Sequence, residues 1–332
     1  MKFLALGDTD GIGASCHFLD LNGSGIALDA GTDPQRDGPD SLPRFDRAGD
    51  RADSYVDHTL ATHAHHDHIG SLPVLVRRFP HAMAHMTDAT KKLLDILLPA
   101  SARLQEKRRD RGETTHEPLF TEDELEALHH LYLTHDLGQG FDLTGPKGQS
   151  SVTGRFFSAG HILGSAGVEL QFEEWGRDRR VFYTSDTNMQ AQTIIPGGEY
   201  PDSTDVLILE STQGAEPEAA ATSRPEERDR FRKTLSQVLA RGGTALIPVF
   251  VMGRAQEILV LLGQLKREGA IPADVPIYPA RSMRALARVY HDPRNPTPRV
   301  PPRAQVYSLP QPRVPSQSPA TREILACPRL RV

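Results

Sequence analysis

Hydrophobic and polar positions in the first two thirds of the chain form short apolar runs that end in polar or glycine-rich turns. Such runs are typical of buried strands. The clearest strand predictions are Gly25–Leu28, Tyr55–Thr62, Arg155–Phe157, Val168–Phe172 and Arg180–Thr187. After residue 68 the spacing becomes helical, with apolar side chains at Ile69, Leu72, Leu75, Val76 and Phe79. The pattern therefore predicts a strand, a turn and an amphipathic helix in succession around residues 55–79.

From residue 205 onward, strand-like and helix-like segments alternate. The predicted strands are Asp205–Thr212, Thr244–Phe250 and Val275–Tyr278, and the predicted helices are Arg224–Ala240, a segment starting at Gly253, and Ser282–Tyr290. This alternation is typical of parallel α/β units. Residues 291–332 then hold ten of the 26 prolines and seven arginines, a composition that predicts an extended, disordered tail.

Composition indicates the cellular compartment of the protein more clearly than the reaction it performs. The 332 residues carry a formal net charge of −5, so any nucleic-acid binding needs a local basic patch. One candidate patch is Arg103, Lys107, Arg108, Arg109 and Arg111, for which a solvated helix face is the alternative. Only Cys16 and Cys327 are present, and no signal peptide or membrane span is evident, which favours a cytoplasmic protein with no membrane partner. The oligomeric state stays open, a homodimer being one alternative.

A cluster of histidines occupies the predicted turn after residue 62. Four of the 14 histidines fall within six residues, in the segment His63-Ala64-His65-His66-Asp67-His68. Imidazole and carboxylate groups are common ligands of divalent cations. Residues two apart at a strand end share a side, so His63 and His65 can face one ion, while Asp67 and His68 could serve a second. A surface histidine run or a purification tag is the alternative, but a tag would be terminal and would not precede an amphipathic helix.

Further candidate ligands stand at the ends of other predicted strands. His161 lies between glycines in the loop Ser158–Gly167, and Asp186 and Asp29 each close an apolar strand. Taken singly, a loop histidine bonded to a carbonyl and an aspartate acting as a turn former or helix N-cap are the competing interpretations.

Together these segments resemble the metallo-β-lactamase superfamily of metal-dependent hydrolases. Leu28-Asp29-Ala30-Gly31 is similar to the first family motif, His63–His68 to the second, and His161 and Asp186 to the third and fourth, in the family's order. The resemblance covers roughly residues 1–212 and implies a four-layer αββα sandwich of the α+β class, with two divalent ions at one edge.

The resemblance also implies a role for each motif residue. His63, His65 and His161 would hold one ion, Asp67 and His68 the other, and Asp186 would bridge the two. Asp67 would also help to orient the attacking water. Asp29 would lie behind the ligands and orient the histidine loop. Zinc suits this histidine-rich donor set, and manganese is the alternative.

The later segments resemble one branch of this superfamily. Leu209–Thr212 and Gly242–Glu257 are similar to the start of the β-CASP cap domain of nucleic-acid-processing members, such as pre-mRNA 3′-end endonucleases and RNase J. Glu210 would then be the acid of the first cap motif, a catalytic residue near the ions. Gln213 departs from the family, which usually carries Tyr there.

The resemblance predicts a metallo-β-lactamase core over 1–205, a partial α/β β-CASP cap over 206–290 and the tail over 291–332. His291 is the only histidine after His161, so we expect the chain to lack a final metal-ligand histidine and the cap histidines, as in a C-terminally truncated member. An incomplete core of this kind also predicts poor solubility.

Three functions stay compatible with the sequence. The first is a β-CASP ribonuclease that hydrolyses phosphodiester bonds in RNA, or in DNA as the alternative substrate. The second is a hydrolase of a small ester, thioester or lactam. The third is a non-catalytic RNA-binding subunit, which would follow if the missing ligand leaves this chain inactive.

Overall fold

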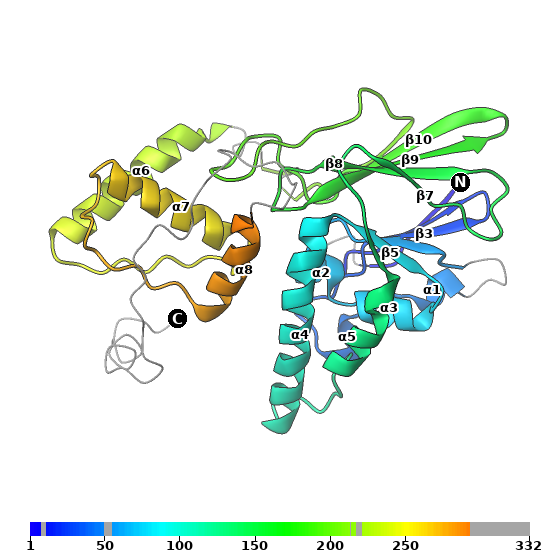
Figure 1. Cartoon of the computed structure of the whole chain (residues 1–332), viewed down its shortest axis with the longest axis horizontal. Coiled ribbons are helices and arrows are strands. Elements are labelled where there is room, and N and C mark those ends of the chain that lie inside the picture. Colours follow the sequence, from blue (N-terminus) through cyan, green and yellow to red (C-terminus); the bar gives the residue numbers. More distant parts are fainter. Residues whose placement is uncertain (8–10, 50–54, 213, 217–220, 293–332) are drawn as a thin grey trace. The chain divides into compact units, whose positions relative to one another are not determined.

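The computed structural model describes residues 1–332 except 8–10, 50–54, 213, 217–220 and 293–332 (Figure 1). The predicted disordered tail thus lies outside the described residues, apart from His291 and Asp292. Among the described residues, one compact unit comprises 1–216 with 288–292, and another comprises 221–287. Each unit is described by itself below.

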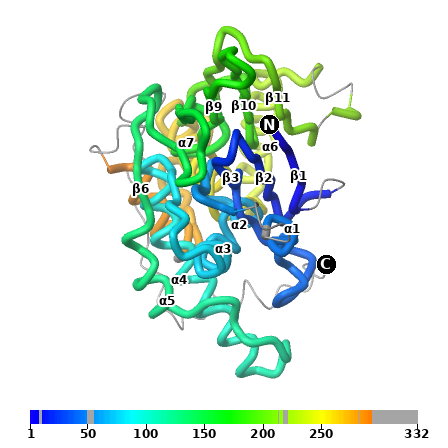
Figure 2. Tube along the Cα trace, turned by 90° about the vertical axis from the view of Figure 1, so that its right-hand side faces the viewer, coloured from blue at the N-terminus to red at the C-terminus, as the bar shows by residue number. Residues whose placement is uncertain are grey.

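The described part of the first unit is built around two β-sheets. The six-stranded sheet has its strands in chain order: β1 (Lys2–Ala5), β2 (His17–Leu21), β3 (Ser24–Leu28), β4 (His58–Leu60), β5 (Met83–Met86) and β6 (Tyr132–Thr134). The five-stranded sheet has the order β11 (Val206–Ile208), β10 (Arg177–Tyr183), β9 (Ala166–Glu174), β8 (Val152–Ser158) and β7 (Gly140–Asp142). Figure 2 shows β1, β2 and β3 running side by side.

The core lies between these sheets, because strands of both direct apolar side chains into the space between them. Alternation of buried and less buried residues is clearest in one strand of the five-stranded sheet. Strand β8 has this pattern, with Val152, Phe156 and Ser158 buried among less buried neighbours. One apolar cluster draws side chains from both sheets, including Leu19, Ile26, Leu28 and Leu60 of the first and Phe156, Val168, Leu170 and Val181 of the second. Burial of this shared face is what holds the two sheets together.

Helices cover the face of the six-stranded sheet that looks away from the second sheet (Figure 1). The longer ones are α3 (Leu72–Arg78), α4 (Asp88–Asp110) and α5 (Glu122–Leu128). Short helices α1 (Asp46–Gly49), α2 (His66–Ile69), η1 (Gly38–Ser41) and η2 (His129–Leu131) occupy connections. The predicted amphipathic helix after residue 68 is thus present as α2 and α3, and two facing sheets with helices outside them agree with the fold class that the motifs predicted.

In its described residues, the second unit contains the helices α6 (Arg224–Ala240), α7 (Arg254–Arg267) and α8 (Arg281–His291), the last of which ends in residues of the first unit. Leu235, Leu262, Leu265 and Ile271 form its buried apolar cluster. The helices agree with the predicted pattern.

The predicted strands of this unit are not formed. Residues 244–250 and 275–278 have no regular secondary structure and belong to no sheet. A parallel strand needs a neighbouring strand for its backbone hydrogen bonds, and the described residues of this unit offer only helices. The two segments instead pack one side on the helices through Ile247 and Ile277 and leave Leu246, Phe250 and Tyr278 exposed.

Candidate metal centre

The candidate ligands lie where strands of both sheets end. Asp29 follows β3, His63 and His65 follow β4, and α2 then carries Asp67 and His68. From the second sheet, His161 follows β8 and Asp186 follows β10. Because β3 and β4 are parallel, their carboxyl ends meet at one edge, and packing of the two sheets brings the second group of loops to the same place.

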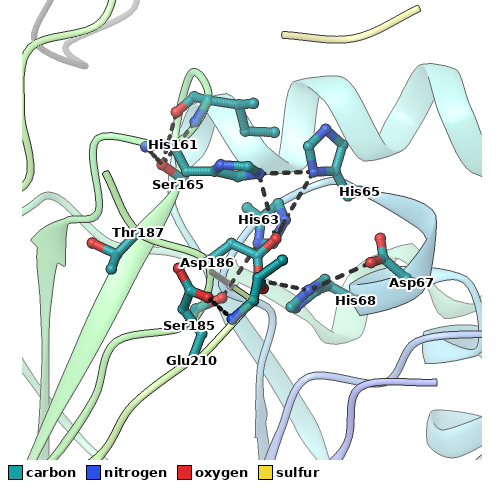
Figure 3. A network of polar contacts seen from close by, with 12 residues as sticks. His63, His65, Asp67, His68, His161, Ser165, Ser185, Asp186, Thr187 and Glu210 are labelled. Carbon is teal, nitrogen blue, oxygen red and sulfur yellow. Dashed lines mark hydrogen bonds and ion pairs between the residues drawn. The ribbon is translucent and has the colours of Figure 1, made fainter. Parts of the chain in front are cut away.

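Four side chains direct one ligand atom each toward a common point (Figure 3). Nδ1 of His65 lies 3.1 Å from Nε2 of His63 and 3.1 Å from Nε2 of His161. Oδ2 of Asp186 lies 3.9 Å from Nε2 of His63 and 3.5 Å from Nε2 of His161. Ligand atoms at about 2.1 Å around a tetrahedral zinc ion would be roughly 3.4 Å apart. The residues therefore fit a metal ion, with three nitrogen donors and one oxygen donor.

A second set of donors meets on the other oxygen of Asp186. Nε2 of His68 lies 3.3 Å from Oδ1 of Asp186 and 3.8 Å from Oδ2 of Asp67. The two oxygens of Asp186 therefore face different donor sets. This is the geometry that a carboxylate shared between two cations requires.

Asp29 lies behind these ligands and is fully buried. Its carboxylate accepts hydrogen bonds from the backbone N–H and the hydroxyl of Thr62, from Nδ1 of His68 and from the hydroxyl of Tyr183. The bond to Nδ1 leaves Nε2 of His68 directed at Asp186. A carboxylate on the far nitrogen of a histidine fixes the ring orientation and makes the near nitrogen a better ligand.

The backbone segment that follows Asp29 contacts the backbone of the histidine loop directly. Ala30 N–H donates to the carbonyl of His68, and the Asp67 carbonyl accepts from Ser15 N–H. A Cβ atom at Gly31 would lie 1.6 Å from the carbonyl oxygen of Asp67, so only glycine permits this approach. The Asp29-Ala30-Gly31 segment thereby positions the second motif through its main chain as well as its carboxylate.

Burial and nearby charges shift the pKa values of His63 and Asp186. Burial, with the charges of His68, His65 and His161, lowers the pKa of His63 well below its usual value, so its imidazole is neutral. Burial opposes the ionisation of Asp186, but the hydrogen bond from His68 and the positive charges of nearby histidines outweigh it and lower the pKa of Asp186 to about 2. A neutral imidazole and an ionised carboxylate are the forms that bind cations.

His68 behaves oppositely because it lies between two carboxylates. Burial disfavours its charged form, but Asp29 and Asp186 outweigh burial and raise the pKa of His68 well above its usual value. The same carboxylates would stabilise a bound cation, so cation binding at Nε2 would compete with this proton.

Glu210 has a different position from the other predicted site residues. It follows β11, its backbone N–H donates to Oγ1 of Thr184, and its carboxylate accepts from the N–H of Thr212. Figure 3 places it beside Ser185 rather than among the histidines. The structure therefore brings together His63, His65, Asp67, His68, His161 and Asp186, with Asp29 behind them, and leaves Glu210 at the margin.

Three residues that support the ligands were missed from the sequence. Thr62 and Tyr183 donate to Asp29, and Ser185 lies against Thr62 and His63. The sequence feature that could have identified two of them is their position next to a ligand, since Thr62 precedes His63 and Ser185 precedes Asp186.

The predicted basic patch lies on α4 and at its C-terminal end, and four of its five residues, all except Lys107, form ion pairs that the structure shows. Its arginines form ion pairs with acidic neighbours: Arg103–Glu122, Arg108–Asp37, Arg109–Glu117 and Arg111–Glu113. The solvated helix face, rather than a nucleic-acid surface, is the interpretation that this pairing favours.

A family model for the metallo-beta-lactamase superfamily matches residues 9–145. The chain is 33% identical over 290 residues to the endoribonuclease ysh-1 of Neurospora crassa, covering 85% of this chain and 31% of that protein. It is 31% identical over 285 residues to cleavage and polyadenylation specificity factor 73 of Drosophila melanogaster, covering 85% of this chain and 38% of that protein. The chain thus spans about a third of the length of these curated relatives.

Among solved structures, a subclass B3 metallo-beta-lactamase of Bradyrhizobium japonicum, BJP-1, is 18% identical with a TM-score of 0.37, covering 68% of this chain and 83% of that one. In the described part of the chain, no helix is both long and apolar enough to cross a membrane. The family match and the curated relatives agree with the resemblance expected from the motifs.

Proposed function

Because this chain carries a metallo-beta-lactamase superfamily domain and is similar to endoribonucleases over 85% of its length, we propose that it forms the metal-binding part of a ribonuclease. The substrate class is RNA, and the reaction is metal-dependent hydrolysis of a phosphodiester bond. The similarity to endoribonucleases supports the substrate class, and the geometry of the donors supports the reaction type.

The observation that supports this proposal most strongly is the sharing of Asp186 between two donor sets. His63, His65 and His161 would hold one divalent ion with Oδ2 of Asp186, and Asp67 and His68 would hold a second with Oδ1. When bound, a pair of such ions supplies Lewis-acid chemistry for in-line phosphoryl displacement. The nitrogen-rich first set favours zinc, with manganese as the alternative to be tested.

The chain's own residues contribute charge and orientation. Asp186 is ionised at neutral pH, and Asp29 holds Nε2 of His68 toward it. Asp67 keeps a quarter of its side chain exposed beside His68, a position from which its carboxylate can accept a proton from an attacking water. Glu210 would be a further catalytic acid, beside Ser185 at the margin of the donor sets.

We propose the domain boundaries and the cellular location together with the function. Residues 1–205 would be the hydrolase core and 206–290 part of a β-CASP cap. Among the described residues, which do not include Cys327, Cys16 is buried and forms no disulfide, and burial strongly raises the pKa of its thiol, as expected of an inert core cysteine. A free cysteine is typical of a reducing compartment, which supports a cytoplasmic location.

The test starts with elemental analysis of the purified chain and continues with labelled RNA, labelled DNA and a chromogenic lactam, each with and without EDTA. We expect RNA cleavage that EDTA abolishes and that the double variant Asp67→Ala/His68→Ala lacks. His66→Ala is the matched control, because His66 is in the same loop but outside both donor sets.

Each other outcome has a distinct meaning. Lactam turnover without RNA cleavage would contradict the proposed substrate and favour a small-molecule hydrolase. Binding of RNA by the metal-loaded chain without cleavage would favour a non-catalytic subunit. Cleavage of DNA alone would retain the reaction but change the substrate.

A further inference from the structure

Ser185 combines a strained backbone with a buried hydroxyl. Its φ of 51° lies in the left-handed region, which a residue bearing a Cβ atom enters at a cost. The residue is 1% exposed and directly precedes Asp186. Unfavourable backbone conformations persist where the surrounding structure holds them, and they concentrate at functional sites.

The side chain of Ser185 belongs to a group of hydroxyls around the far nitrogen of His63. Its Oγ lies 2.6 Å from Oγ1 of Thr62 and 3.4 Å from Nδ1 of His63. Oγ1 of Thr62 is 3.2 Å from the same Nδ1. Thr62 and His63 are also fully buried, so the protein itself must satisfy these polar atoms.

The direction of each hydrogen bond follows from the carboxylate at the end of the group. The Asp29 carboxylate is the acceptor for every donor around it, so the single hydroxyl proton of Thr62 is donated to it over 2.8 Å. Oγ1 of Thr62 is then an acceptor toward its other neighbours. The Ser185 hydroxyl donates to Thr62, and Nδ1–H of His63 donates to the pair of hydroxyl oxygens. This arrangement places the ring proton on Nδ1 and the lone pair on Nε2.

We propose that Ser185 is a positioning residue: together with Thr62 it holds His63 in the Nδ1–H tautomer and directs Nε2 into the donor set formed with His65, His161 and Asp186. The inference rests on the proposed metal site and deepens it. Asp29 thereby orients both halves of the site, binding His68 directly and His63 through the two hydroxyls. The strained backbone places the hydroxyl against Thr62 and the next side chain, Asp186, among the ligands.

Two variants separate the hydroxyl from the backbone. Ser185→Ala keeps the Cβ atom and the strain but removes the hydroxyl, whereas Ser185→Gly removes both and relieves the strain. Thr187→Val is the matched control, because it deletes a hydroxyl on the other side of Asp186 whose partners are Tyr200 and the Ala159 carbonyl. Each full-length protein is stripped of metal, and its zinc affinity is measured by competition with a chromophoric chelator.

We expect both Ser185 variants to bind zinc about 10- to 100-fold more weakly than wild type, and Thr187→Val to bind it normally. In the cobalt-loaded protein, the exchangeable Nδ1–H proton of His63 should give a sharp, shifted NMR signal that broadens in both Ser185 variants. A thermal melt of the metal-free proteins checks folding, and the strain-relieved glycine variant keeps the test valid if the alanine variant does not fold.

Wild-type affinity and an unchanged Nδ1–H signal in both variants would overturn the inference while leaving the metal site standing. Weakening in only one of the two folded variants would assign the effect to the backbone and would also overturn the role of the hydroxyl. Failure of the wild-type chain to bind zinc, cobalt or manganese would instead contradict the proposed function, and this inference would fall with it.

Discussion

Oδ2 of Asp29 lies 2.9 Å from Nδ1 of His68, and neither side chain is open to solvent. The contact turns the opposite nitrogen of the ring toward Asp186, 3.3 Å away. His68 is therefore held between a carboxylate that orients it and a carboxylate with which it would share a cation. The pair therefore connects the hydrogen bonds that Asp29 receives with the ligand position of Asp186.

Replacement of Asp29 by Asn should weaken metal binding without removing any ligand. An amide cannot accept all four hydrogen bonds that the carboxylate receives, so His68 and Thr62 lose their fixed partner. We expect zinc affinity to fall about 10- to 100-fold and stability to fall by about 1–3 kcal/mol, measured by chelator competition and urea unfolding.

Asp57→Asn is the matched control for this change. Asp57 is also buried and its carboxylate accepts from Gly25 N–H, but it precedes β4 whereas the ligands follow that strand. The control should lower stability and leave zinc affinity unchanged. Equal loss of affinity in both variants would contradict the special role of Asp29.

Replacement of Asp186 by Ala should affect both donor sets together. Each set contains one of its oxygens, whereas His161 belongs to the first set alone. After desalting, we expect about two zinc ions per wild-type chain, about one in His161→Ala and little retained zinc in Asp186→Ala. Elemental analysis gives the stoichiometry, and equal retention in the two variants would contradict a shared carboxylate.

Three histidines outside both donor sets, His58, His85 and His135, contact one another in a row. We expect this row to lower the free energy of unfolding at acid pH. Nε2 of His85 is 3.0 Å from Nδ1 of His58, and Nδ1 of His85 is 2.9 Å from Nε2 of His135. Burial, followed by the charges of His58 and His135, lowers the pKa of His85 to about 3. Between this value and the unfolded-state pKa of about 6.5, only the unfolded chain takes up the proton, so stability falls as pH falls through that window.

His85→Gln removes this titration. In metal-free protein, the variant should show a pH dependence of unfolding free energy that is shallower by up to about 1.4 kcal/mol per pH unit between pH 6.5 and 3, whatever its stability at pH 7. Urea unfolding at stepped pH values measures the slope. His130→Gln controls for loss of an exposed imidazole, and an unchanged slope in His85→Gln would show that this buried row does not control acid stability.

The exposed apolar side chains of the second unit should promote self-association. Leu246 is 66% and Phe250 82% exposed, whereas Ile247 beside them packs against the helical cluster. The double change Leu246→Ser/Phe250→Ser should raise solubility and reduce light scattering with no loss in melting temperature. Ile247→Ser, which alters the side chain packed on the helical cluster, should instead lower stability by about 1–3 kcal/mol. A soluble, monomeric wild-type chain would contradict the expectation.

Much of the first unit could be predicted because its signals are local. The apolar run before His63 and the helical spacing after His68 place the histidines on a strand-to-helix turn, and the structure has β4 followed by α2 and α3 there. Asp29, His161 and Asp186 could likewise be placed at strand ends, because the periodicity of burial changes where a strand ends. The histidine-rich segment and the family order of the motifs predicted the kind of chemistry.

The second unit shows where local reasoning fails. Residues 244–250 have the composition of a strand, but strand formation depends on a neighbouring strand that the described residues of this unit do not supply. Propensity alone cannot provide the missing backbone hydrogen bonds.

The sequence by itself determined which donors this protein has and that they stand at strand ends, because both facts follow from residue type and short-range spacing. Only the tertiary structure decided that the two oxygens of Asp186 face different donor sets, that Asp29 supports His68 directly and His63 through Thr62, and that Ser185 joins this group. These relations join residues as far apart in the chain as Thr62 and Ser185, which are separated by 123 positions, and they depend on how two sheets pack. Packing direction and ring orientation come from contacts across the core, which no local pattern encodes.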